Sequence, residues 1–138
     1  MTVAPVLDSF ALLAFLRGEP GAEPVSSLLE SAADRDAPVH MTEVNYAEVK
    51  YMVLRKNGPA RWKDVAARLP TLPIRFHPAN RDLADLAADL KSRHRLSLAD
   101  AFAAALAKQK KAALVTGDPE FRALEKEIKI QWLPVSEP

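Results

Sequence analysis

Short apolar runs alternate along this chain with longer stretches in which apolar residues recur at helical spacing. The short runs are rich in Val, Ile and Leu and end at an acid, a threonine or a proline, which is typical of buried strands. Strands that are separated by helices favour parallel pairing through right-handed crossovers, so the pattern predicts a layered α/β domain. The expected strands are 3–7, 38–41, 74–77, 112–115 and 128–133.

Capping residues and helix breakers delimit the segments between these strands. Gly18 has the sequence position of a C-terminal helix cap, and Thr42 has that of an N-terminal cap. Gly58, followed by Pro59, separates two helices. The expected helices are Ser9–Arg17, 22–34, 43–57, Ala60–Leu69, a helix that starts at Asn80 or Asp82, Ser97–Lys110 and Pro119–Lys126.

The composition is that of an ordinary globular protein, with 49% hydrophobic and 27% charged residues. With 138 residues the chain can bury a substantial core, and we expect residues 1–138 to form a single domain. The absence of cysteine excludes disulfides and thiolate metal sites. No basic leader and no apolar run of roughly 18 residues is visible, so we expect a cytoplasmic protein that is not bound to a membrane.

The formal net charge of +1 does not by itself predict a nucleic-acid partner. Basic residues gather in the segments 55–63, 93–95 and 108–111, and each group can be read as a solvated helix end. The three histidines are read as core or surface residues. Among them, His94 has the basic neighbours that are best suited to contact a phosphate.

Two acids occupy positions where a parallel sheet places its binding sites. Such sites lie at the carboxyl ends of the strands, and Asp8 and Asp118 each follow an apolar strand. Thr116 adds a hydroxyl at the same strand end as Asp118. Each aspartate could instead be a plain N-cap, because each precedes a predicted helix and Pro119 suits the first helical position.

Two more acids lie on predicted helices beside that edge. No basic residue stands three or four positions from Glu48, although an exposed place at the edge of the apolar stripe would also explain it. Asp100 fits a capping box that begins at Ser97. The same helical face continues with alanines, which let a helix lie close to a sheet and carry the acid inward.

Carboxylates that converge without cationic partners repel one another and have raised pKa values. Hard cations with oxygen ligands remove this penalty. Convergence of these acids therefore predicts a site for Mg²⁺ or Mn²⁺ made by Asp8, Glu48, Asp100 and Asp118.

Four segments, in order and with compatible spacing, resemble those of PIN-domain proteins over essentially the whole chain. The segments are Val6–Leu13, Asn45–Val49, Asp100 with the alanines that follow it, and Val115–Phe121. The chain is also similar in length to the toxin subunits of VapBC-type toxin–antitoxin pairs.

The resemblance implies a three-layer α/β/α fold with a parallel five-stranded sheet of order 3-2-1-4-5. It also implies an endoribonuclease that depends on Mg²⁺ or Mn²⁺ and cleaves RNA. The implied catalytic site consists of Asp8, Glu48, Asp100 and Asp118, with Thr116 as an accessory polar group. The implied partners are an antitoxin protein and a second copy of the chain in a homodimer.

Three alternatives stay open at the level of the sequence. Glu43 could supply the acid in place of Glu48, although the apolar face beside Glu48 favours the latter. The domain could also be a non-catalytic module that binds RNA or a protein. A phosphohydrolase that uses Asp8 as its nucleophile is disfavoured, because Phe10 stands where a second acid would be expected.

Overall fold

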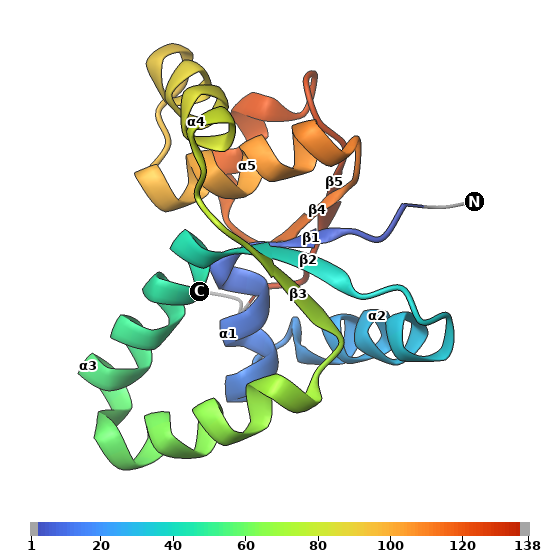
Figure 1. Ribbon diagram of the computed structural model, residues 1–138, viewed down its shortest axis with the longest axis vertical. Helices are drawn as coiled ribbons and strands as arrows, with labels where there is room; N and C mark the ends of the chain where they lie inside the picture. Colours follow the sequence, from blue (N-terminus) through green and yellow to red (C-terminus); the bar gives the residue numbers. More distant parts are fainter. Residues whose placement is uncertain (1–2, 136–138) are drawn as a thin grey trace.

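The computed structural model describes residues 3–135, which form a five-stranded sheet between two layers of helices (Figure 1). The sheet has the order β3-β2-β1-β4-β5 and every neighbouring pair is parallel, which confirms the predicted fold. The strands are β1 (Val6–Leu7), β2 (Val39–Thr42), β3 (Ile74–His77), β4 (Leu114–Thr116) and β5 (Ile130–Trp132). The helices are α1 (Ser9–Arg17), α2 (Ala22–Asp34), α3 (Glu43–Arg68), α4 (Arg81–Arg93) and α5 (Leu98–Lys110), with the 3₁₀ helices η1 (Leu69–Thr71) and η2 (Pro119–Leu124).

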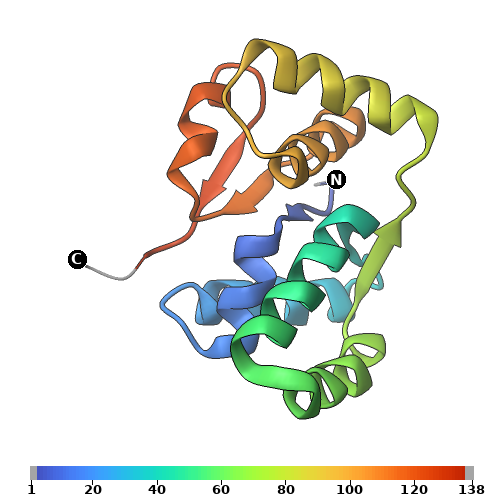
Figure 2. The same ribbon diagram turned by 90° about the vertical axis from the view of Figure 1, so that its left-hand side faces the viewer.

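Figures 1 and 2 show α4 and α5 on one face of the sheet and α1, α2 and α3 on the other. The central strand β1 supplies both faces. Val6 packs into the core that contains α4 and α5, and Leu7 packs into the core that contains α1 and α2. Because side chains alternate along a strand, a strand covered on both sides needs apolar residues at every position.

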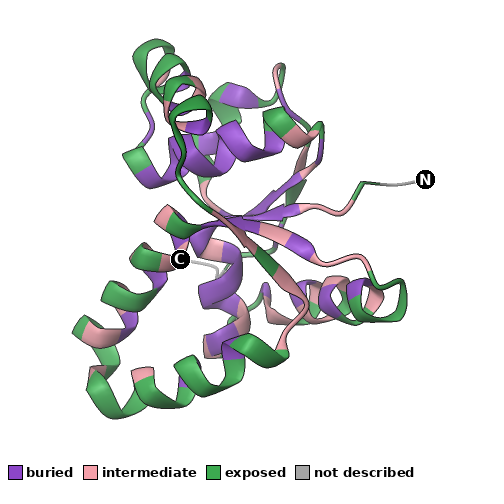
Figure 3. Cartoon of the chain, in the orientation of Figure 1, coloured by how far each residue is buried: buried purple, intermediate pink, exposed green. Residues whose placement is uncertain are grey.

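Helix α5 is buried along most of its length, as Figure 3 shows. Its residues from Ala101 to Ala107 are all buried, and five of these seven are alanine. Such small side chains let the helix axis approach the sheet closely. None of the helices formed by residues 3–135 combines the length and the hydropathy that a membrane crossing requires.

The break predicted at Gly58 lies inside α3 and divides it into two arms (Figure 1). Gly58 has φ 88° and ψ 172°, a conformation that is open mainly to glycine. The first arm starts at the predicted cap, where the Thr42 hydroxyl accepts a hydrogen bond from the backbone N–H of Asn45. The second arm is mostly exposed (Figure 3), so the first arm is the one that can position buried groups.

Several predicted bounds differ from the structure, among them those of β4 and β5, which start at Leu114 and Ile130 and not at 112 and 128. The first strand has two residues instead of five, because Pro5 has no N–H to donate to a neighbouring strand. The segment after Pro119 is a 3₁₀ helix that ends at Leu124 and not an α-helix to Lys126. Phe121 and Leu124 are both buried, and their spacing of three residues places them on one side of a 3₁₀ helix.

Candidate functional site

An open pocket of about 420 Å³ lies at the carboxyl ends of β1 and β4. All four acids that the sequence predicts for the site line this pocket. Arg17, in the last turn of α1, is the one basic residue among the described residues of its wall. The acidic residues of the wall are Asp8, Glu19, Glu48, Asp100, Asp118 and Glu120.

Asp8 is held by hydrogen bonds on both carboxylate oxygens and is only 1% exposed. Its Oδ1 accepts from the backbone N–H of Ala11 at 2.8 Å, so Asp8 is the N-cap of α1. Its Oδ2 accepts from the Thr116 hydroxyl at 2.5 Å, and that hydroxyl accepts from the backbone N–H of Asp118 at 3.0 Å. One carboxylate therefore caps a helix and also lines the pocket, so these two roles are compatible.

Burial dominates the ionisation of the two most enclosed acids. It raises the pKa of Asp8 to about 7, and the charges of Asp118 and Glu48 act in the same direction, against the lowering effect of the hydrogen bonds from Thr116 and Ala11. Burial also raises the pKa of Asp100 to about 8, followed by the charge of Asp118. The pocket thus disfavours its own ionised carboxylates.

No lysine or arginine of the described residues forms an ion pair with these acids. Among residues 3–135, every ion pair ends on Glu127, which contacts Arg93, His94 and Lys108 at 2.6, 2.9 and 3.3 Å. This network holds the pKa of Glu127 at about 2, chiefly through the hydrogen bonds from Arg93 and His94. Glu127 does not line the acidic pocket, so none of these ion pairs reaches the acids of the pocket.

Asp100, Asp118 and Glu120 approach one another most closely. One carboxylate oxygen of each lies within 4.8 Å of the other two, a spacing that suits several carboxylates around a single cation. Glu120 is absent from the residues that the sequence predicts for the site. The feature of the sequence that could have indicated Glu120 is the turn that begins at Pro119. In this turn the backbone N–H of Glu120 donates to Asp118 Oδ1 at 2.9 Å.

Glu48 lines the pocket, whereas Glu43 at the start of the same helix is exposed and does not. The buried Asn45 fixes this part of α3. Its Nδ2 donates to the Ser9 hydroxyl at 3.0 Å and to the carbonyl of Ala99 at 3.2 Å. A single amide therefore joins the first turns of α1, α3 and α5, which are the helices that present the acids.

The histidines do not take part in the pocket. His94 forms a hydrogen bond with Glu127, and this bond competes with the phosphate contact that the basic neighbours of His94 suggest. His40 and His77 bond to each other across β2 and β3 at 2.8 Å. Burial lowers the pKa of both, to about 4 for His40, and the pair is thus held neutral near pH 7.

Gly117 allows the Phe10 ring to lie at the rim of the pocket. A Cβ at Gly117 would stand 2.3 Å from the nearest ring carbon, so the ring would have to move. We expect Gly117→Ala to lower the free energy of unfolding by about 1–3 kcal/mol through overpacking. Phe10→Ala should remove that penalty, which chemical denaturation of the four proteins in a double-mutant cycle will measure.

Gly21→Ala is the matched control for this steric account, because a Cβ there meets nothing nearer than 3.2 Å. Its cost should be clearly smaller. Purely additive effects of the substitutions at Gly117 and Phe10 would contradict the explanation.

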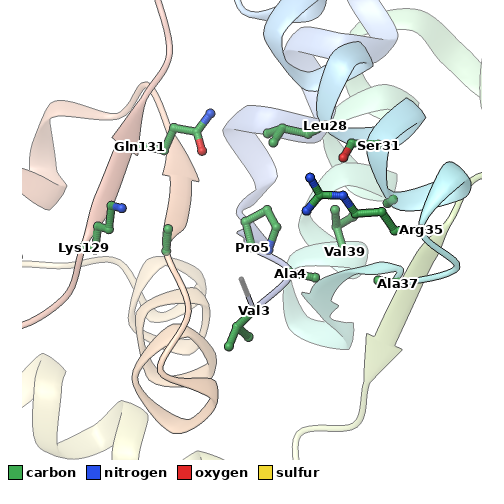
Figure 4. A pocket seen from close by; sticks show the side chains of 12 residues that line it. Val3, Ala4, Pro5, Leu28, Ser31, Arg35, Ala37, Val39, Lys129 and Gln131 are labelled. Carbon is green, nitrogen blue, oxygen red and sulfur yellow. The ribbon is translucent and has the colours of Figure 1, made fainter. Parts of the chain in front are cut away.

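A second cavity, of about 210 Å³, lies at the opposite, amino end of the strands (Figure 4). Figure 4 shows Arg35 extending from α2 toward the space in front of Pro5, with Gln131 on the far side. Its described wall is mainly apolar and contains no carboxylate. The carboxylate cluster of the described residues lies instead at the carboxyl end of the sheet.

Comparison with known proteins agrees with this architecture. Residues 6–127 match the family model of the PIN domain, whereas no curated protein matches the chain in sequence. The fold is similar to VapBC2 from Rickettsia felis bound to a promoter DNA fragment, with a TM-score of 0.74 and 15% identity over 94% of this chain and 98% of that one. The fold is also similar to that of a toxin–antitoxin complex from Klebsiella pneumoniae, with a TM-score of 0.71 and 16% identity over 96% of this chain and 99% of that one.

Another similar structure is Mycobacterium tuberculosis VapC20, a Sarcin-Ricin loop cleaving toxin, with a TM-score of 0.69 and 19% identity over 96% of this chain and 98% of that one. Identities this low show a common fold. The family model, in contrast, spans most of the sequence. On that evidence the chain belongs to the PIN-domain family.

Proposed function

We propose that this protein is an endoribonuclease that hydrolyses RNA phosphodiester bonds with Mg²⁺ or Mn²⁺, and that it is the toxin of a type II toxin–antitoxin pair. One observation carries the proposal. Carboxylates from four separate segments converge in one pocket, and none of them forms an ion pair with a described residue. Burial there raises the pKa values of Asp8 and Asp100. Groups with strongly raised pKa values in a cleft mark candidate functional sites.

The donor set fits a hard divalent cation, because every acidic ligand offers oxygen. Asp8, Glu48, Asp100 and Asp118 would hold the ion, together with Glu120. A bound Mg²⁺ or Mn²⁺ would supply a water of lowered pKa and positive charge beside the phosphoryl group.

Thr116 would act through Asp8. Its hydroxyl donates to the Asp8 carboxylate and so favours the ionised form that a metal requires. The same hydroxyl accepts from the backbone N–H of Asp118, so it also sets the path of the chain between the two acids.

The choice of RNA rests on three supports. The pocket is open and lies at the edge of the sheet, which suits a polymer better than an enclosed small molecule. The chain belongs to the PIN-domain family, whose members are generally nucleases. The similar VapC20 is a Sarcin-Ricin loop cleaving toxin.

Incubation of the purified protein with labelled structured and single-stranded RNAs tests the proposal. We expect cleavage with Mg²⁺ or Mn²⁺, none in EDTA, and recovery when the metal is restored. A non-catalytic module would instead bind RNA equally well with and without EDTA and would cut none of the RNAs. That result would overturn the proposed activity.

An antitoxin and a second copy of the chain are the proposed protein partners. The antitoxin is supported by the similar structures, which include toxin–antitoxin complexes. Expression of this chain alone should arrest growth. Co-expression of an antitoxin-like, DNA-binding protein encoded by a short neighbouring reading frame should relieve the arrest. A gene without such a neighbour, whose expression leaves growth unchanged, would point to RNA processing instead.

A further inference from the structure

Arg17, the one basic residue among the described residues of the acidic pocket, has two buried nitrogens without an acceptor in the described part of the chain. Its Nε and Nη2 are buried and make no hydrogen bond to any described residue. Among residues 3–135, no other side chain has buried polar atoms in this state. Because an unpaired buried donor on a charged group costs free energy, such an atom in a native fold calls for an explanation.

The position of Arg17 at the end of α1 does not supply that explanation. A cation in the last turn is favoured by the helix dipole, but it needs no burial. The carbonyl of Leu16 at the same helix end accepts a hydrogen bond from Arg61 Nη2 at 3.0 Å and not from Arg17. Nor do the acids of the pocket pair with Arg17, since all ion pairs of the described residues end on Glu127.

The two unpaired nitrogens define the kind of ligand that would satisfy them. The N–H groups of Nε and Nη2 point in parallel from one edge of a guanidinium, spaced to meet two oxygens of one phosphate or carboxylate. The pocket wall already carries an excess of carboxylates. A phosphodiester that enters it would bring an anion of this kind, which Arg17 would bind by turning its guanidinium from the buried position toward the pocket.

The length of α1 indicates which phosphate this would be. Asp8 caps one end of the helix and Arg17 lies at the other, nine residues later. At 1.5 Å per residue the two backbone positions are about 13 Å apart. The Arg17 side chain can lean back toward the N-terminus of the helix and lines the same pocket as the acids, but it is attached at the far end of α1.

We propose that Arg17 binds two non-bridging oxygens of an RNA backbone phosphate next to the one that is cleaved, and so sets the register of the substrate. The inference rests on the proposed nuclease function. It assigns Arg17 to substrate binding and leaves the bond-breaking chemistry to the acids.

Arg17→Gln tests the assignment in the metal-loaded protein, with steady-state cleavage of a single-stranded RNA as the first readout. We expect KM to rise at least about tenfold while kcat changes little, because one charge-assisted contact to the backbone is lost. The melting temperature should stay the same or rise, since the substitution removes buried donors that have no partner.

Direct binding supplies the second readout. In an Asp100→Asn background, which leaves the RNA intact, fluorescence anisotropy gives the dissociation constant at several salt concentrations. Loss of one phosphate contact should reduce the slope of log K against log[salt] by about 0.7. Arg17→Lys should restore that slope but not the full affinity. The lysine ammonium keeps the positive charge but lacks the two parallel N–H groups of the guanidinium.

Arg61→Gln is the matched control, because it removes one charge near the same end of α1 from a guanidinium that already has a partner. It should lower the melting temperature and leave KM unchanged. An Arg17→Gln protein with wild-type KM, or one that is simply less stable, would overturn the assignment while the nuclease function stands. Failure of the wild-type protein to cleave any RNA would instead overturn the nuclease function itself.

Discussion

An Asp100→Asn variant is expected to lose at least about 100-fold in the rate of RNA cleavage, the low end of what removal of a charge-stabilising group costs. The reason is local, because Asp100 lies in the three-acid cluster with Asp118 and Glu120. The fold should survive, because asparagine has nearly the same shape. Removing an acid whose pKa is raised to about 8 should even increase the melting temperature at pH 8 in EDTA.

Steady-state cleavage and thermal unfolding of the same preparation measure both effects. Glu48→Gln and Glu43→Gln form a matched pair within one helix, since Glu48 lines the pocket and Glu43 is exposed. Activity should fall in the first and remain in the second. Full activity of purified Asp100→Asn, with contaminating nuclease excluded, would contradict the metal site.

The metal-free protein is expected to lose stability as the pH rises from 6.5 to 8, and Mg²⁺ should reverse the loss. The folded pKa values of Asp8 and Asp100, about 7 and about 8, lie above the ordinary value of 3.8. The folded state therefore binds more protons than the unfolded state, and the free energy of unfolding falls with increasing pH. Each such proton contributes about 1.4 kcal/mol per pH unit, so we expect a loss on the order of 2 kcal/mol.

The pH window matters because other groups act in the opposite direction at lower pH. The lowered pKa values of His40 and His77 increase stability as the pH rises, and most of this contribution is present by pH 6.5. The stability due to Glu127 is present above pH 4.5 and is lost as the pH falls toward 2. Between pH 6.5 and 8 the two aspartates thus dominate the change.

Urea unfolding at several pH values, in EDTA and in excess Mg²⁺, provides the measurement. Stabilisation by Mg²⁺ should be greater at pH 8 than at pH 6, because the ion competes with protons for the carboxylates. Asp100→Asn should flatten the pH dependence in EDTA. Stability that rises with pH between 6.5 and 8 in EDTA, or a Mg²⁺ effect independent of pH, would show that these acids do not form a metal site.

The dual role of Asp8 explains why a local interpretation of the sequence was incomplete without being wrong. Its carboxylate is the N-cap of α1, as the position after a strand and before a helix suggests. The cap uses only one oxygen. The other is directed to Thr116, a residue 108 positions away, and this pairing exists only because β1 and β4 are neighbours.

Patterns along the chain were enough to predict the order of the strands and helices, the family resemblance, the caps at Thr42 and Gly18, and the break at Gly58. These features depend on hydrophobic period and on the conformational limits of single residues, both of which are local. The sequence also placed Asp8 and Asp118 after strands, and a parallel sheet brings such positions to one edge.

Which side chains meet at that edge depends on the packing of the whole domain, and the structure was needed to see it. The structure placed Glu48 and not Glu43 in the pocket, because Asn45 anchors the first turn of α3 to two other helices. It brought Glu120 next to Asp100 and left two nitrogens of Arg17 buried without partners. Such features depend on contacts between residues far apart in the chain, on which hydrophobic period and capping carry no information.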